Sequence, residues 1–238
     1  MLKTILKILR IDINENERLI DLIASYSKLK KISRDYKVKV ITDNDNLDKK
    51  LFDDLYKIRY EIYCLLDKLL DENDYPEKYE TDEYDKHSTH LIILDKKEKI
   101  IGTTRVIRNS VLSFPTLKEF HLEKELESLP HEKIAEISRF IIIPEYRKTL
   151  LFLDLCKVMY LFNKKMGIRY YLGCGEMWFI KKLKATFGEV KILGEPLFCF
   201  NALNYPFLID TKNLEERLPI QNKILLQYFN SEDKSMKF

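Results

Sequence analysis

The sequence predicts a mixed α/β fold, with a central sheet and helices on both of its faces. Strand-like and helix-like segments alternate along the chain after residue 36. Two β-branched segments, 90–94 and 100–107, are joined by a short polar connection typical of a hairpin. The apolar segment 135–143 has the composition of a buried central strand. This order of elements does not fit a doubly wound dinucleotide-binding fold, and neither glycine-rich nucleotide fingerprint occurs.

Each element follows from local patterns. The expected strands are 36–42, 90–94, 100–107, 135–143, 168–172, 190–193, 197–202 and 207–209, and the expected helices are 47–66, 117–129, 148–166 and 176–187. Gly167 and Gly188 are expected to end the last two helices, because glycine readily adopts the left-handed conformation of a helix C-terminus.

The composition narrows the class of protein. The chain has 238 residues, of which 45% are hydrophobic, enough for one large core. With 41 basic and 38 acidic side chains the net charge is only +3, which argues against a nucleic-acid partner. The four cysteines form no Cys-x-x-Cys pair, and no apolar run approaches the roughly 20 residues that span a bilayer. We therefore expect a cytoplasmic protein without a bound metal.

One boundary is expected inside the chain. Residues 1–35 are lysine-rich and helical in pattern, and we expect them to extend a domain that covers 36–238. Within residues 1–10, apolar side chains at helical spacing alternate with basic ones. Two interpretations stay open: this helix packs on the domain, or it makes a peripheral contact with a membrane or partner.

Three polar clusters are hard to explain by core packing. The first is Arg59 on the helix 47–66, and the second is the acidic segment 80–85. The third, Glu136, Ser138 and Arg139, lies inside the most apolar strand, where ionised groups are costly unless paired. Strand alternation predicts Glu136, Ser138 and Phe140 on one face and Arg139 on the other. A structural ion pair is as good an explanation as function from these patterns alone.

These clusters carry a family resemblance. The segments are LYKIRYEIY at 55–63, YP at 75–76, ETDEYD at 80–85, IGTTR at 101–105, FP at 114–115, AEISRF at 135–140, GEP at 194–196 and YP at 205–206. In order and rough spacing they resemble the acyl-homoserine-lactone synthases. They are more similar still to the N-acyl amino acid synthases and exosortase-associated acyltransferases. These families belong to the GNAT acyltransferase superfamily, and the resemblance covers roughly residues 50–210.

The resemblance implies a GNAT-like mixed sheet that splays into a V where a thioester enters, and a site built on it. It implies a network of Arg59, Asp82, Asp85, Arg105 and Arg139, with Glu136 as the general base. Ser138 would orient water or the amine, and backbone amides near 140–143 would bind the oxyanion. Arg59 or Arg105 would either hold a substrate carboxylate or neutralise Asp82 and Asp85, and both roles stay open. Phe140 is expected among the apolar residues that line a tunnel for the acyl chain; the others are Trp178, Phe179, Phe187 and Phe198.

The implied activity is transfer of a fatty acyl group from a thioester to the amine of an amino acid or related small molecule, with no permanently bound cofactor. The donor would be an acyl carrier protein or acyl-CoA. Segment 145–150 lacks the glycines of a pyrophosphate loop, which favours the carrier. Basic residues would dock this acidic partner: Arg147, Lys148, Lys181, Lys182 and Lys184. The alternatives are a homoserine-lactone synthase, which would use S-adenosylmethionine, and a non-catalytic module that binds acyl carrier or lipid.

Overall fold

The protein folds around one mixed sheet, seen in a computed structural model that describes residues 36–42, 48–108, 110–212, 214, 216 and 228–231. The sheet order is β1-β2-β3-β4-β5-β8-β6, with β7 paired to β8. Neighbouring strands are antiparallel except β4 and β5, which run parallel. The expected extension over 1–35, and with it the membrane contact of residues 1–10, lies outside the described residues.

The strands are β1 (Lys37–Thr42), β2 (Ser88–Leu94), β3 (Ile100–Ile107), β4 (Ile134–Ile142), β5 (Tyr170–Gly175), β6 (Lys191–Ile192), β7 (Leu197–Cys199) and β8 (Ala202–Asp210). The α-helices are α3 (Lys49–Tyr60), α4 (Pro115–Phe120), α5 (Glu123–Leu126), α6 (Leu151–Lys165) and α7 (Met177–Phe187). A π-helical turn, η2 (Glu61–Leu66), continues α3. Within the described part of the chain, no helix combines the length and the apolar character needed to cross a bilayer.

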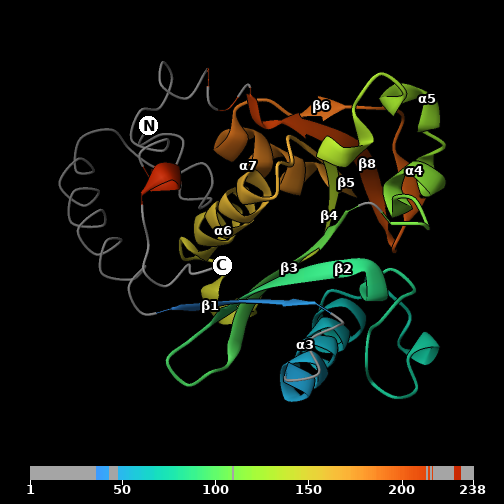
Figure 1. Ribbon diagram of the computed structural model, residues 1–238. Helices are drawn as coiled ribbons and strands as arrows, with labels where there is room; N and C mark the ends of the chain where they lie inside the picture. Colours follow the sequence, from blue (N-terminus) through green and yellow to red (C-terminus); the bar gives the residue numbers. More distant parts are fainter. Residues whose placement is uncertain are drawn as a thin grey trace, which may run out of the picture.

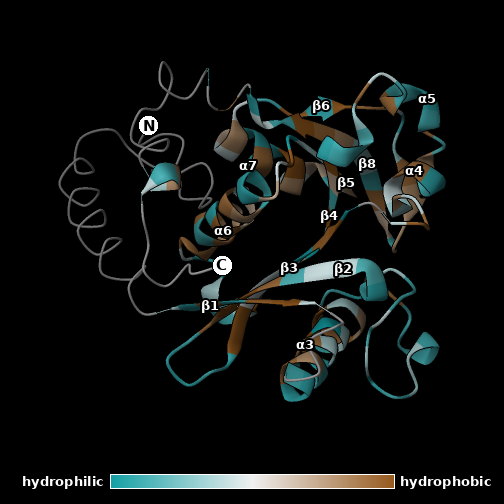
Figure 2. Ribbon diagram, in the orientation of Figure 1, coloured by the Kyte–Doolittle hydropathy of each residue, from teal (hydrophilic) through white to brown (hydrophobic). Residues whose placement is uncertain are grey.

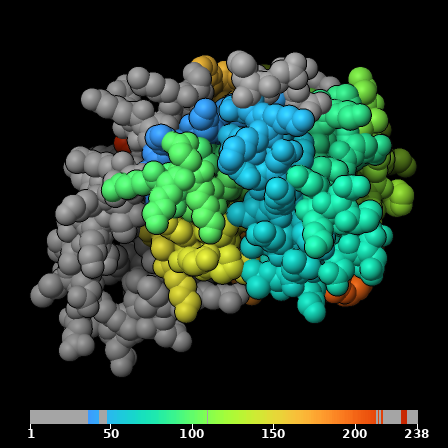
Figure 3. Space-filling model, turned by 90° about the horizontal axis from the view of Figure 1, so that it is seen from below, coloured from blue at the N-terminus to red at the C-terminus, as the bar shows by residue number. Residues whose placement is uncertain are grey.

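Helices cover both faces of the sheet (Figure 1). On one face α6 and α7 pack on a core that includes Leu91, Ile101 and Tyr171. On the other face α3 covers the first strands through Leu55 and Ile92, while α4 and α5 cover the later strands. Figure 2 shows hydrophobic residues along these strands and hydrophilic ones in the β2–β3 hairpin loop. Seen from below, α3 and the chain that follows it cover a broad face beside that hairpin (Figure 3). The predicted arrangement of layers is confirmed.

The sheet splays apart between β4 and β5. Their pairing runs from Ile134 opposite Tyr170 to Glu136 opposite Leu172 and stops there. Beyond this point β4 stays with β3, and β5 continues to Gly175 alongside β8. The predicted V is therefore present, and its apex lies at Glu136.

Several expected boundaries were wrong for local reasons. The helix expected over 47–66 ends as an α-helix at Tyr60, because its last turn closes with π-type hydrogen bonds such as Asp67 N–H to the Ile62 oxygen, 2.8 Å. The helix expected over 117–129 is two short helices, because His121 adopts a left-handed φ of 53°. The last strand starts at Ala202 instead of 207, since Pro206 lies within β8 without ending it.

Candidate active site

Three arginines, of which Arg59 and Arg105 are buried and Arg139 is half-buried, form one network with three carboxylates. Arg59, on α3, donates to Glu80 and to Asp85. Arg105, on β3, donates to Asp82 and, at 2.9 Å, to Asp85. The network therefore joins α3, the loop after η2 and the central strands into one unit.

Arg139 completes the network from β4. Its guanidinium donates to Glu80 at 2.8 Å and to Asp82 at 3.0 Å. The formal charges of the six side chains cancel, which offsets the large cost of burying four of them and partly burying Asp82 and Arg139. Glu80 belongs to the acidic segment that the sequence pointed to, but its role between Arg59 and Arg139 was missed. A single acidic run does not reveal which of its carboxylates turns inward.

The expectation that Arg139 lies on the face opposite Ser138 was wrong. Between Thr103 and Arg105 the pairing of β3 with β4 shifts by one residue, so β4 carries a bulge. Arg139 has a φ of 50° there. One extra residue reverses the alternation of side chains beyond it. Arg139 thus joins the network, and Phe140 turns to pack on Phe152 and Phe179.

Glu80 and Asp85 are held in their ionised form. Burial alone would raise the pKa of Glu80, but Arg139 and Arg59 outweigh it and hold that pKa below its usual range. Burial likewise opposes ionisation of Asp85, and Arg59 and Arg105 hold its pKa far below the ordinary value. These side chains therefore remain charged at neutral pH.

Glu136 has a different environment from the network carboxylates. It is 2% exposed, and its two oxygens accept hydrogen bonds from Thr116, at 2.9 Å from N–H and 2.8 Å from Oγ. Burial raises the pKa of Glu136 to about 7, against the lowering effects of Thr116 and of the more distant Arg105 and Arg139. A carboxylate with a pKa near 7 is suited to accept a proton and release it again.

A cavity of about 550 Å³ opens beside Glu136, between the splayed strands. Its polar wall includes Asp82, Arg105, Glu136, Ser138 and Arg139. Its apolar wall includes aromatic and leucine side chains from η2, the loop after it, β4, α7 and the β7–β8 turn: Tyr63, Leu69, Leu70, Phe140, Trp178, Phe179 and Phe200. The molecule therefore presents an ionisable carboxylate to a half-open, largely apolar cavity.

The structure separates the predicted site residues into two groups. Asp82, Arg105, Glu136, Ser138, Arg139 and Phe140 line the cavity. Arg59 is 0% exposed and Asp85 is 4% exposed, and neither lines it. The expectation that Arg59 could hold a substrate carboxylate is therefore corrected: it neutralises Glu80 and Asp85 instead.

The structure places only some of the residues that were expected to line an apolar tunnel at the cavity. Phe140, Trp178 and Phe179 line the cavity. Phe187 instead packs in the core against Tyr171, and Phe198 is 73% exposed on β7. Phe200 takes a place in the wall that the sequence did not assign.

Cys174 also faces the cavity but is a poor nucleophile. Burial raises the pKa of its thiol to about 12, so it stays protonated at neutral pH.

Of the predicted docking residues, Arg147 and Lys148 precede α6, and Lys181, Lys182 and Lys184 lie on α7. Arg147 forms two hydrogen bonds to Asp67, which occupies its guanidinium. Lys182 lies over the rings of Trp178 and Phe152, at 5.2 and 5.4 Å, so α7 is beside the first turn of α6. Lys148, Lys181 and the neighbouring Lys184 present exposed or half-buried side chains.

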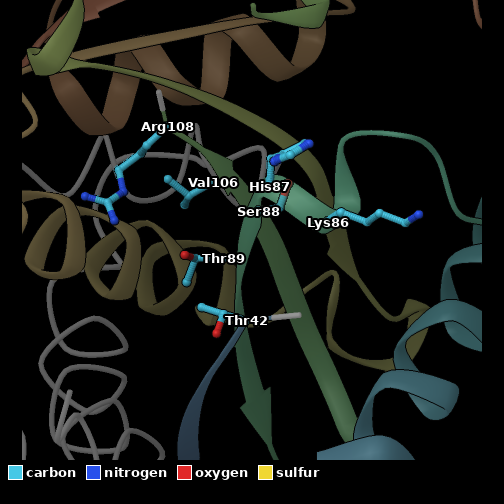
Figure 4. Close-up of a pocket in the computed structure, with 7 residues that line it drawn as sticks. All are labelled: Thr42, Lys86, His87, Ser88, Thr89, Val106 and Arg108. Carbon is cyan, nitrogen blue, oxygen red and sulfur yellow. The ribbon is translucent and has the colours of Figure 1, made fainter. Parts of the chain in front are cut away.

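A second, smaller cavity of about 230 Å³ lies away from the splayed strands, at the ends of β1, β2 and β3. Its basic residues are Lys86, His87 and Arg108. Figure 4 shows Lys86 and Arg108 pointing away from each other, so they do not converge on one ligand. The candidate site is therefore the larger cavity.

Comparison with known proteins agrees with this fold. Residues 58–157 match the family model described as an acetyltransferase (GNAT) domain. The chain thus has a GNAT-like α/β fold, the class of structure built on a splayed mixed sheet.

The chain is also similar to individual proteins of known activity or structure. An L-ornithine N(alpha)-acyltransferase from Rhizobium meliloti (strain 1021) is 30% identical over 108 residues, covering 41% of this chain. The match spans about a third of that relative, 36% of its length. Among solved structures, the CoA-dependent acyl-homoserine lactone synthase BjaI has a TM-score of 0.58 at 21% identity, over 77% of this chain and 90% of its own. FeeM, an N-acyl amino acid synthase from uncultured soil microbes, has a TM-score of 0.53 at 12% identity, over 76% and 94%.

Proposed function

We propose that this protein is an N-acyltransferase that moves a fatty acyl group from a thioester to the amine of an amino acid or a related small molecule. The observation that carries the proposal is Glu136, a carboxylate with a pKa raised to about 7 that faces a largely apolar cavity between splayed strands. The similarity to an ornithine N-acyltransferase supports an amino acid as the acceptor.

The reaction requires a proton acceptor beside the amine. The neutral amine nitrogen attacks the thioester carbonyl, an N–C bond forms, and the carbon–sulfur bond breaks as the tetrahedral intermediate collapses. Glu136 accepts the proton that the nitrogen loses and then gives a proton to the departing thiolate. The products are an amide and a free thiol, and Glu136 returns to its starting state.

Other groups around the cavity assist this step. Ser138 Oγ accepts a hydrogen bond from Arg105 Nε at 3.0 Å, which leaves its own hydrogen to donate to the amine or to water. Past the apex of the V, the β4 backbone no longer pairs with β5, and amides in segment 140–142 are suited to bind the oxyanion. The Ile143 amide donates to the Ile101 oxygen at 3.2 Å and is already used.

An acyl carrier protein is the donor we favour, with acyl-CoA as the alternative. Amides at the start of a helix bind a pyrophosphate in many nucleotide sites. Two such amides of α6 are used within the chain: Leu151 N–H donates to Thr149 Oγ1, and Leu153 N–H donates to the Leu150 oxygen. The adjoining basic residues of α6 and α7 would attract an acidic carrier. BjaI, however, is CoA-dependent, so both donors belong in the test.

The test incubates purified protein with a long-chain acyl thioester, on carrier or on CoA, and a mixture of amino acids. We expect release of free thiol and an N-acyl amino acid detected by mass spectrometry. Glu136→Gln should lower the rate by about 10²–10⁴-fold, the usual contribution of a general base. Glu98→Gln, which removes an exposed carboxylate on the β2–β3 hairpin, is the matched control.

The alternatives predict other outcomes. A lactone formed from S-adenosylmethionine would favour a homoserine-lactone synthase. Binding of carrier or lipid without any thiol release would favour a non-catalytic module. Glu136→Gln with wild-type activity would remove Glu136 from the mechanism. Charge reversal at Lys181 and Lys184 should raise KM for the carrier-bound donor and leave KM for acyl-CoA unchanged.

A further inference from the structure

Glu136 is held in place by a single residue from outside its own strand. Both of its carboxylate oxygens accept hydrogen bonds from Thr116, one from the backbone N–H and one from the hydroxyl. In the part of the chain that the structure describes, no other side chain or amide hydrogen-bonds this carboxylate. Thr116 is itself only 1% exposed. The pair is therefore a buried two-point contact between α4 and β4.

Thr116 is rigidly placed by its own neighbours. Pro115 occupies the first position of α4, where its fixed φ suits a helix start. Phe114 and Leu117, on either side, are 5% and 3% exposed in the core below α4. A threonine held in this way cannot follow Glu136 if the carboxylate swings away, so it fixes where the carboxylate points.

Thr116 also opposes the effect of burial on Glu136. Burial is the largest influence on the pKa of Glu136 and raises it. The backbone and hydroxyl hydrogen bonds of Thr116 are the next largest, and both lower it. Arg105 on β3 and Arg139 on β4 act in the same direction but less strongly.

The remaining titratable groups around Glu136 do not replace this contact. Cys174 on β5 stays protonated, because burial raises the pKa of its thiol to about 12. The cavity wall also carries four carboxylates and one ammonium group: Asp82, Glu83, Glu119, Glu176 and Lys118. None of these five side chains hydrogen-bonds Glu136 in the described structure, so Thr116 is the group that contacts this carboxylate directly.

We infer that Thr116 is a positioning residue, which favours the ionised form of the Glu136 carboxylate and aims it into the cavity for proton transfer. The inference rests on the proposed function, because it assigns Thr116 a role through the proposed base. Thr116 itself takes no part in bond making or breaking. Phe114 and Pro115 were among the segments that carry the family resemblance, but the sequence assigned no role to the neighbouring Thr116.

The test compares three variants. Thr116→Val keeps the shape and the backbone bond but loses the hydroxyl, whereas Thr116→Ser keeps the hydroxyl. Thr186→Val is the matched control, since Thr186 is a fully buried threonine on α7 whose hydroxyl bonds only the Lys182 oxygen in the described structure. For each, the pH profile of kcat/KM is measured with the better donor.

A hydrogen bond to a charged group corresponds to about one pH unit or more. We therefore expect the midpoint of the acidic limb of the Thr116→Val profile to lie about one pH unit higher than in wild type. Below that midpoint kcat/KM should be about tenfold lower than in wild type, and at high pH it should recover. Thr116→Ser and Thr186→Val should keep the wild-type midpoint. An unmoved limb in Thr116→Val, or an equal shift in Thr116→Ser, would overturn the inference. If Thr116→Val does not fold, Thr116→Ala carries the same expectation.

A second measurement separates this inference from the proposed function. Carbon-13 NMR of labelled glutamate carboxyl groups follows the titration of Glu136 without any substrate, and the signal is assigned by its loss in Glu136→Gln. A shifted titration in Thr116→Val, in a protein that transfers no acyl group, would defeat the proposed function and leave the control of Glu136 by Thr116 standing. Acyl transfer with an unshifted titration would defeat the inference alone.

Discussion

Glu80 offers the sharpest test of the charge network. It is 0% exposed and lies between Arg59 and Arg139, each of which donates to it. Glu80→Gln has nearly the same shape but removes one negative charge. The network would then hold three cations against two anions, and Arg59 beside Glu80 is 0% exposed, so water cannot reach its uncompensated charge.

The expected cost follows from this burial. Removing one partner of a buried ion pair typically costs about 3–5 kcal/mol, because the other charge is left uncompensated. At 3 kcal/mol the ratio of unfolded to folded protein rises about 100-fold, and Tm falls by about 10 °C for a chain of this size. The matched control is Glu98→Gln, since Glu98 pairs with Lys37 at the surface, with side chains 56% and 64% exposed. Such exposed pairs contribute less than about 1 kcal/mol.

Urea and thermal unfolding of the two variants measure the difference. At pH 7 we expect Glu80→Gln to lose several kcal/mol and Glu98→Gln almost nothing. The pKa of Glu80 is lowered in the folded state, so its contribution is present above the unfolded value of about 4.3 and is lost as pH falls below it. The gap between wild type and Glu80→Gln should therefore narrow in acid. Two variants of equal stability at pH 7 would refute the buried, balanced network.

Further predictions concern Glu136, the V and the cavity. The pKa of Glu136 is raised from about 4.3 in the unfolded chain to about 7 in the folded protein, so its contribution to stability is lost as pH rises from about 4 to 7. In urea unfolding, the free energy of unfolding of Glu136→Gln should exceed that of wild type by about 3 kcal/mol at pH 8 and match it near pH 4. Gly173→Ala would place a Cβ 2.9 Å from the Ile137 oxygen, beside the apex of the V, and should lower the free energy of unfolding by about 1–3 kcal/mol. The control, Gly102→Ala, meets no atom closer than 3.4 Å and should lower it less. Equal losses of stability in the two variants would contradict this packing. Phe179→Ala should enlarge the cavity and shift preference toward longer acyl chains in a competition assay, and an unchanged preference would exclude Phe179 from the acyl wall.

The aromatic residues show where sequence reasoning stopped. Periodicity marks Phe187 and Phe179 alike as apolar positions of α7, yet only Phe179 reaches the cavity, while Phe187 packs between Tyr171 and Phe229. The two differ by their angular position on the helix relative to β5 and β8. That position depends on how α7 docks on the sheet, which no local pattern encodes.

The sequence by itself determined the order of strands and helices, the central apolar strand and the clusters of charge, since periodicity, turn residues and residue type are local properties. Only the tertiary structure decided which charges meet. A one-residue bulge in β4 directs the Arg139 side chain toward Glu80 in the network and the Phe140 side chain toward Phe152 on α6. Pairing across 59 residues put Glu80 against Arg139, and pairing across 20 residues put Thr116 on Glu136. Such contacts form because burying a charge requires a partner, and the partner is supplied by whichever distant segment the sheet brings near.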